Sequence, residues 1–144
     1  KIDYVYFQTG LSYLKESPDA IDRDQQYLDD AMHYFTLAMN QPESPHASPA
    51  HENWNEARRR LAERSFYVGR FYFRNEEYLA AIPRFEEVVL KYSGLGLDEK
   101  SLYYLGRSYV KLRDELKARE VFALFDQHFP ESRYRKKLAR KLED

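Results

Sequence analysis

Two arginines that stand among aromatic side chains are the residues most able to do chemistry in this sequence. Arg70 and Arg107 each follow a glycine directly, in segments with helical patterning. A guanidinium group can pair bidentately with a carboxylate, and aromatic rings offer contact area to a polypeptide. This pattern favours noncovalent binding of an extended or aromatic-rich peptide. The aromatic residues expected to line such a site are Phe7, Phe66, Phe73 and Tyr103.

The same rings have a simpler interpretation. Apolar stripes on helices usually pack against neighbouring helices rather than against a ligand. The sequence leaves both interpretations open for each aromatic residue, and it favours a binding role more for Arg70 and Arg107 than for the rings.

Residues that could support catalysis or metal binding are poorly placed. The chain has no cysteine, no G-x-S-x-G motif and no glycine-rich phosphate loop. Asp22 and Asp24 begin like a calcium loop, but its sixth and twelfth positions would be Tyr27 and His33, where Gly and Glu are needed. The histidines are scattered without ligand spacing, at positions 33, 46, 51 and 128. We therefore expect no enzymatic activity, no metal and no cofactor.

The overall charge gives no reason to expect a nucleic acid partner. The 144 residues contain 23 basic and 24 acidic side chains, for a formal net charge of −1. No apolar stretch approaches the roughly 18 to 20 residues that a membrane span needs. Few Gly and Pro among abundant Leu, Ala, Glu, Lys and Arg favour helices. Partners should therefore be selected by local patches on a helical protein.

Two segments of the chain repeat one spacing of small and aromatic residues. Equivalent positions lie 37 residues apart (106 − 69): Gly69 with Gly106, Tyr72 with Tyr109, Ala81 with Ala118, and Phe85 with Phe122. Both segments resemble the tetratricopeptide pattern, in which small residues let the two helices of a hairpin approach closely. In the last copy we expect Gly106 and Ala118 to form that contact, while Phe122 and Phe125 fill the space around it.

A third, N-terminal copy contains Gly10, Ala31 and Phe35, with a longer loop between its helices. We predict an all-α fold of tetratricopeptide hairpins in a right-handed superhelix, as a single domain over residues 1–144. Its parts are repeat 1 over 2–40 with a loop insertion at 16–25, a connection over 41–53, repeat 2 over 54–92, repeat 3 over 98–128, and a capping helix over 131–142.

Prolines are expected to disturb helices at two places. From Asn40 to Asn53, three Pro and two Ser favour a polar connection, with helix resuming near Trp54. Pro83 lacks the N–H that would bond to the carbonyl of Leu79, so it should kink or delay the second helix of the middle repeat.

Beyond the generic repeat, the chain resembles the BamD-like family of outer-membrane lipoproteins, which belong to the bacterial β-barrel assembly machinery. The likeness is densest at Asp22–Gln25 in DRDQQYLDDAMHYF and from Leu61 to Val89 in LAERSFYVGRFYFRNEEYLAAIPRFEEVV. The resemblance implies the periplasmic face of the bacterial outer membrane, reached only through a lipidated N-terminal Cys that this chain lacks. The chain would then be the C-terminal part of a longer protein.

The resemblance also implies partners. They are the periplasmic domains of the barrel subunit, other assembly lipoproteins, and unfolded outer-membrane protein peptides. The alternative is a generic tetratricopeptide adaptor, periplasmic or cytosolic, that binds one peptide in its groove. The carboxylate clamp of chaperone-binding relatives is absent, because aromatic residues (Phe66, Tyr67, Tyr103 and Tyr104) hold the positions of its Asn and Lys.

Certain residues are implicated in partner binding by this resemblance. Arg84 matches a family position that contacts the partner's periplasmic domain, and Glu87 belongs to the same expected surface. Alternatively, Arg84 is an exposed arginine paired with Glu87 or Glu77. In the longer loop, Asp22, Arg23 and Asp24 either bind a partner or fold the loop on itself through Asx-type hydrogen bonds. In tetratricopeptide folds the first helix of each hairpin lines the concave face, so Phe7, Phe66, Arg70, Phe73, Tyr103 and Arg107 should face the groove.

Overall fold

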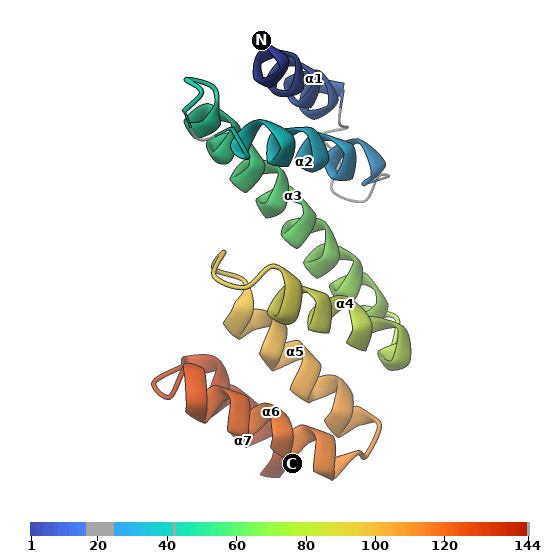
Figure 1. The fold of residues 1–144 in the computed structure, drawn as a ribbon. Coiled ribbons are helices and arrows are strands. Elements are labelled where there is room, and N and C mark those ends of the chain that lie inside the picture. Colours follow the sequence, from blue (N-terminus) through green and yellow to red (C-terminus); the bar gives the residue numbers. More distant parts are fainter. Residues whose placement is uncertain (17–24, 42, 144) are drawn as a thin grey trace. The chain divides into compact units, whose positions relative to one another are not determined.

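The computed structural model describes residues 1–16, 25–41 and 43–143 of the chain, and these residues form seven α-helices and no strand (Figure 1). The helices are α1 (Ile2–Glu16), α2 (Gln26–Met39), α3 (Ala47–Arg74), α4 (Tyr78–Lys91), α5 (Asp98–Lys111), α6 (Glu115–His128) and α7 (Arg133–Glu143). The predicted all-α class is confirmed. The loop insertion predicted at 16–25 falls mostly outside the described residues.

The chain divides into two compact units, Lys1–Arg64 and Ser65–Asp144. The boundary falls inside α3, so one continuous helix contributes residues to both units. Each unit has its own set of fully buried side chains, among them Phe35 in the first and Phe85 and Phe125 in the second. The predicted single domain, the bounds of repeats 1 and 3, and the superhelix stay predictions.

In the first unit, α1 and α2 pack against each other around a glycine. A Cβ atom on Gly10 would lie 2.7 Å from two ring carbons of Phe35, so only hydrogen at this position leaves room for the ring. Phe35 is completely buried, and the rings of Tyr13 and Tyr34 stack in the same hairpin with centroids 5.7 Å apart. The predicted pairing of a small residue with a large one is found in this hairpin.

Helix α3 begins at Ala47, so the predicted connection over 41–53 and the helix start at Trp54 are wrong. Pro49 lies in the first turn of α3, where backbone N–H groups have no acceptor within the helix and proline costs nothing. Pro45 precedes the helix, and the amide of His46 donates to the Ser44 hydroxyl at 3.0 Å. The prolines therefore start this helix rather than keep it from forming.

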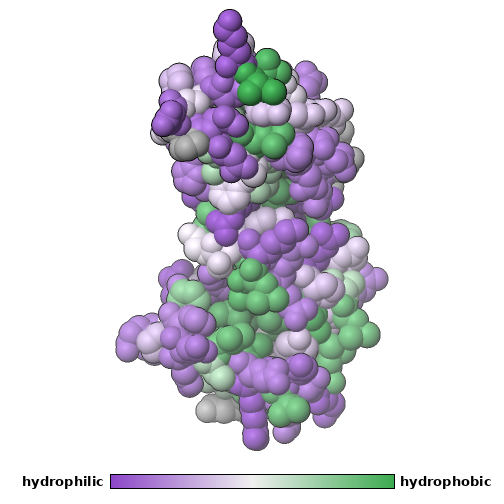
Figure 2. Space-filling model, viewed as in Figure 1, coloured by the Kyte–Doolittle hydropathy of each residue, from purple (hydrophilic) through white to green (hydrophobic). Residues whose placement is uncertain are grey.

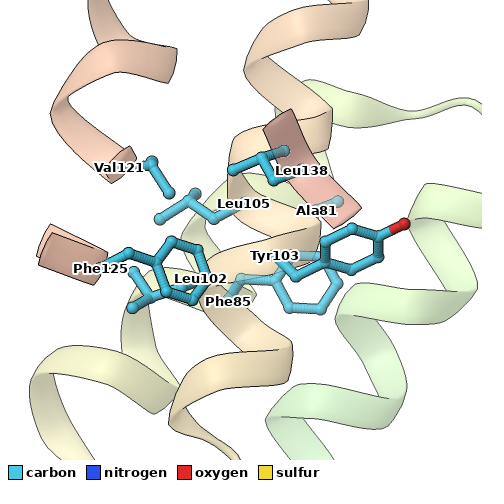
Figure 3. Packing of buried hydrophobic residues seen from close by; sticks show 8 residues of the cluster. All are labelled: Ala81, Phe85, Leu102, Tyr103, Leu105, Val121, Phe125 and Leu138. Atoms are coloured by element: carbon cyan, nitrogen blue, oxygen red, sulfur yellow. The ribbon is translucent and has the colours of Figure 1, made fainter. Parts of the chain in front are cut away.

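The second unit is held together by a core that draws on four of its helices (Figure 3). Its buried members are Ala81, Phe85, Leu102, Tyr103, Leu105, Val121, Phe125 and Leu138. A Cβ atom on Gly69 would lie 2.9 Å from the ring of Phe85, which repeats the contact between Gly10 and Phe35. The helices α3 and α4 therefore approach closely at the predicted glycine.

Gly106 makes room for a different neighbour from the one predicted. A Cβ atom there would lie 2.5 Å from a methyl carbon of Leu138, which belongs to α7 rather than to the hairpin partner α6. Leu138 is fully buried, whereas Phe122 is only half buried. The last helix therefore packs Leu138 against α5, and its role as a cap of the repeats stays a prediction.

Two equivalent turns confirm the spacing of 37 residues in the backbone. Glu76 and Arg113 both adopt a φ of 60°, the left-handed conformation that ends many helices. After each of them, an amide bonds back across the turn at 2.9 Å, from Glu77 to the carbonyl of Tyr72 and from Asp114 to that of Tyr109. Asp114 also caps α6 by accepting from the amide of Lys117.

Candidate functional site

Arg70 and Arg107 both lie against aromatic rings in the second unit. The guanidinium carbon of Arg70 is 6.0 Å from the ring centre of Phe66 and 5.6 Å from that of Tyr104. That of Arg107 is 4.8 Å from the ring centre of Phe73 and 5.5 Å from that of Tyr103. We call these residues the aromatic–arginine cluster: Phe66, Arg70, Phe73, Tyr103, Tyr104 and Arg107.

Helical spacing explains why α3 and α5 bring these side chains together. Phe66, Arg70 and Phe73 lie four and three residues apart, so they follow one face of α3. Tyr103 and Arg107 lie four apart on α5. The two faces meet where the ring centres of Phe73 and Tyr104 are 5.2 Å apart. The cluster therefore depends on regular helix geometry and not on a loop.

The aromatic members of the cluster also pack against the core of the second unit. Phe66, Phe73 and Tyr104 are half buried against the core, and Tyr103 is buried. Tyr104 stacks on Phe85 with ring centres 5.4 Å apart. The simpler interpretation, in which the rings fill space between helices, therefore applies at least in part to every aromatic member.

The two arginines keep their charge available. Neither side chain forms an ion pair or hydrogen bond with any residue that the structure describes, and both are half buried. A guanidinium that rests on aromatic faces gains about 0.5–1 kcal/mol from each exposed contact and still has its N–H groups free to donate. The cluster can therefore hold a carboxylate with its arginines and contact an apolar side chain with its rings.

One predicted member of the cluster belongs to the other unit, and one residue joins the cluster that was not predicted. Phe7 belongs to the first unit, where its ring centre lies 6.3 Å from that of Phe35 and 5.4 Å from that of His46. Tyr104 stands at the centre of the cluster, although the sequence singled it out only as a position lacking a clamp residue. The aromatic pair at 103–104 was the available signal, because neighbouring positions on a helix point about 100° apart and can contact two neighbours.

Arg84 and Glu87 lie on α4, and they do not pair with each other. Glu87 accepts a hydrogen bond from the hydroxyl of Ser65, which is fully buried. Arg84 is half buried and forms no hydrogen bond or ion pair within the described part of the chain. The alternative that Arg84 is paired with Glu87 or Glu77 is therefore wrong.

Three apolar side chains lie on the solvent face of α4. Leu79 is 76% exposed and Leu90 is 81% exposed, and Pro83 between them is also exposed. Figure 2 shows apolar patches at the surface in the region of α4, among hydrophilic neighbours. Leu79, Pro83 and Leu90 therefore form one exposed apolar stripe, whereas Arg84 lies on the flank of α4, about 140° around the helix from Leu79 at about 100° per residue.

No contact or distance can be given for the other partner-binding residues predicted from the sequence. Asp22, Arg23 and Asp24 lie outside the described residues. In residues 1–16, 25–41 and 43–143, no three His, Asp or Glu side chains are grouped closely enough to hold a metal ion. None of the helices described is both long and apolar enough to cross a membrane.

Comparison of the sequence with known proteins places the chain in a family. Residues 1–124 match the YfiO family, whose description is outer membrane lipoprotein. Several relatives carry the name outer membrane protein assembly factor BamD. The relative from Caulobacter vibrioides is 24% identical over 132 residues, covering 91% of this chain and 43% of its own length.

Two other relatives with this name have similar identity and coverage. That from Rickettsia prowazekii is 27% identical, over 92% of this chain and 53% of its own length. That from Vibrio cholerae is 30% identical, over 78% of this chain and 51% of its own length. The chain spans about half the length of these relatives. Because the family match extends over most of the chain, the chain belongs to the YfiO family of outer membrane lipoproteins.

Proposed function

We propose that this chain is a docking scaffold for the assembly of outer-membrane proteins. The observation that carries the proposal is the family match over residues 1–124, together with relatives that are named outer membrane protein assembly factors. The scaffold acts by binding polypeptides and not by catalysis. Its place is the periplasmic face of the outer membrane.

The partner surface in this proposal is the solvent face of α4. Leu79 and Leu90 supply apolar surface on that face, and Arg84, on its flank, supplies a guanidinium with no partner in the described part of the chain. An interface of this kind gains most of its affinity from a few buried anchors surrounded by weaker contacts. The proposed occupants are the periplasmic domains of the barrel subunit, with other assembly lipoproteins bound elsewhere on the scaffold.

The aromatic–arginine cluster is proposed to bind a second kind of partner. Its two arginines and its partly exposed rings suit an extended segment that carries both carboxylates and aromatic side chains. Unfolded outer-membrane protein peptides are the proposed ligands. Separate surfaces for the assembly partner and for its substrate would let one scaffold hold both at once.

The test of the docking surface is the charge reversal Arg84→Glu. We expect it to weaken capture of the barrel subunit's periplasmic domains at least about tenfold, because reversing a charge at an interface replaces attraction with repulsion. Capture is measured by pull-down and then by titration, with circular dichroism to show that helical content is kept.

Arg119→Glu is the matched control, because it reverses an exposed arginine on α6, away from α4. Equal capture by Arg84→Glu and the unmodified chain would remove α4 from the interface. That outcome would favour the generic peptide-binding adaptor over the assembly scaffold.

A further inference from the structure

A pocket of about 540 Å³ lies at the end of α5, between the turn into α6 and the end of α7. Among the described residues, four basic side chains line it, those of Arg107, Lys111, Arg113 and Lys141, against a single acidic one, Glu115. The charge that these residues place on its walls is therefore +3 (4 − 1). We call it the basic pocket, and all of these residues belong to the second unit.

The four positive charges of the basic pocket are not neutralised by ion pairs within the described part of the chain. Arg107 rests on aromatic rings, and none of the four side chains forms an ion pair or hydrogen bond there. Nearby basic residues behave differently, since Lys117 pairs with Glu120 and Arg135 with Asp126. Like charges that converge on one pocket repel one another, and an anion bound among them relieves that repulsion.

Apolar side chains form the rest of the wall. Val110 is half buried there, and Leu142 is 41% exposed. A simple anion such as phosphate would leave this apolar surface in water. A ligand that carries a carboxylate next to an apolar side chain would cover both kinds of surface, and a volume within about 300–1,000 Å³ suits a few side chains.

We propose that the basic pocket binds an acidic segment of polypeptide in which glutamate or aspartate alternates with apolar residues. Arg107 and Arg113 pair with carboxylates through two N–H groups each, whereas Lys111 and Lys141 attract them as point charges. Val110 and Leu142 contact the apolar side chains. This site differs from the α4 surface, shares Arg107 with the aromatic–arginine cluster, and does not depend on a role at the outer membrane.

Glu115 gives the proposal its sharpest consequence. Its carboxylate is the one acidic group among the described pocket residues, so it opposes an acidic ligand. Removing that charge should tighten binding, while removing lysine charges should weaken it. Opposite effects from substitutions on one wall are not produced by loss of folding.

The experiment titrates the chain into a fluorescein-labelled peptide of alternating Glu and Leu, amidated at its C-terminus and free of the aromatic side chains that suit the aromatic–arginine cluster, and measures fluorescence anisotropy. We expect Lys111→Gln with Lys141→Gln to weaken binding about tenfold, and Glu115→Gln to strengthen it about threefold, as charge-assisted contacts in a partly exposed site predict. A peptide of alternating Lys and Leu should not bind.

The matched control is Lys100→Gln with Arg119→Gln, which removes two exposed positive charges from α5 and α6 outside the pocket. We expect this control to change the affinity by less than about twofold, because neither side chain lines the pocket and salt screens the charges of exposed side chains. Equal weakening by the control and by the pocket variant would overturn the proposal.

Other outcomes would also overturn it. Displacement of the peptide by inorganic phosphate at the same concentration would mean that the pocket takes small anions without regard to apolar contacts. Lysine-dependent capture of phosphatidylglycerol vesicles, without capture of the acidic peptide, would assign the pocket to lipid headgroups. Weaker binding with Glu115→Gln would contradict the charge argument itself.

Discussion

Gly106 shows how one small residue sets the distance between two helices. In the first two hairpins the glycine faces a phenylalanine of the following helix, as with Gly10 and Phe35 or Gly69 and Phe85. At Gly106 the neighbour is Leu138, on a helix that follows the last hairpin. The glycine has kept its role of allowing close approach, but a different helix uses the space.

We predict that Gly106→Ala destabilises the protein by up to about 2 kcal/mol. The alanine gains about 1 kcal/mol of helix propensity, but its Cβ would lie 2.5 Å from a methyl carbon of the fully buried Leu138, and relieving such an overlap costs about 1–3 kcal/mol. Urea denaturation followed by circular dichroism measures the free energy of unfolding.

Leu138→Ala provides the control for this contact. Alone it should cost about 2–5 kcal/mol, as truncation of a buried leucine does. Combined with Gly106→Ala, it should cost less than the sum of the two single effects by about 1 kcal/mol, because the methyl groups that cause the overlap are gone. Simple additivity would show that the overlap is relieved without cost.

At the scale of helices, regular patterns were predictable from the sequence and positional exceptions were not. The register of Gly10, Gly69 and Phe85 follows from periodicity, which reflects the packing of one helix face on another. The start of α3 at Ala47 does not follow from periodicity. A proline breaks the interior of a helix but is tolerated in the first turn, where Pro49 lies. Only knowledge of where the helix begins distinguishes the two cases.

The same division applies to the candidate site. The sequence predicted that Arg70 and Arg107 would lie among aromatic rings, since a spacing of four residues on one helix places Phe66 beside Arg70 and Tyr103 beside Arg107. It did not predict the basic pocket, because Lys111 and Lys141 are 30 residues apart (141 − 111) and meet only when α7 packs on α5. Contacts between distant segments depend on tertiary packing that no local pattern encodes.

Helix α4 is continuous although it contains a proline in its interior. Pro83 lies in the interior of α4, where it removes the hydrogen bond to the carbonyl of Leu79, yet the helix runs from Tyr78 to Lys91. Burial of Ala81, Phe85 and Val88 on the opposite face holds α4 in place despite that loss.

We predict that Pro83→Ala raises the free energy of unfolding by about 1–3 kcal/mol. The side chain at this position is exposed, so alanine loses little packing while it restores a backbone donor and a good helix former. The change is measured by urea denaturation. A lower free energy of unfolding would mean that proline fits a bend that α4 requires.

At the scale of the whole molecule, two compact units share one helix. Unit 1 is stabilised around Phe35 and unit 2 around Phe85 and Phe125, while α3 contributes residues to both. In proteins made of stacked helical units, each unit interacts with its neighbours and local opening can occur in one part without the other. Because α3 is continuous, it is the element that can couple the stability of one unit to that of the other.

Phe35→Ala should therefore loosen the first unit far more than the second. Loss of a fully buried phenylalanine costs about 3–5 kcal/mol, and the ring of Phe35 packs against Gly10 and Phe7 in its own unit. Hydrogen–deuterium exchange read by mass spectrometry should show faster exchange in α1, in α2 and in α3 up to Arg64. The amides of α5, α6 and α7 should keep their protection.

Phe125→Ala is the reciprocal control, and it should loosen α5, α6 and α7 instead. If either substitution exposed the amides of both units equally, α3 would couple them into one cooperative structure, because opening one core would then require opening the other.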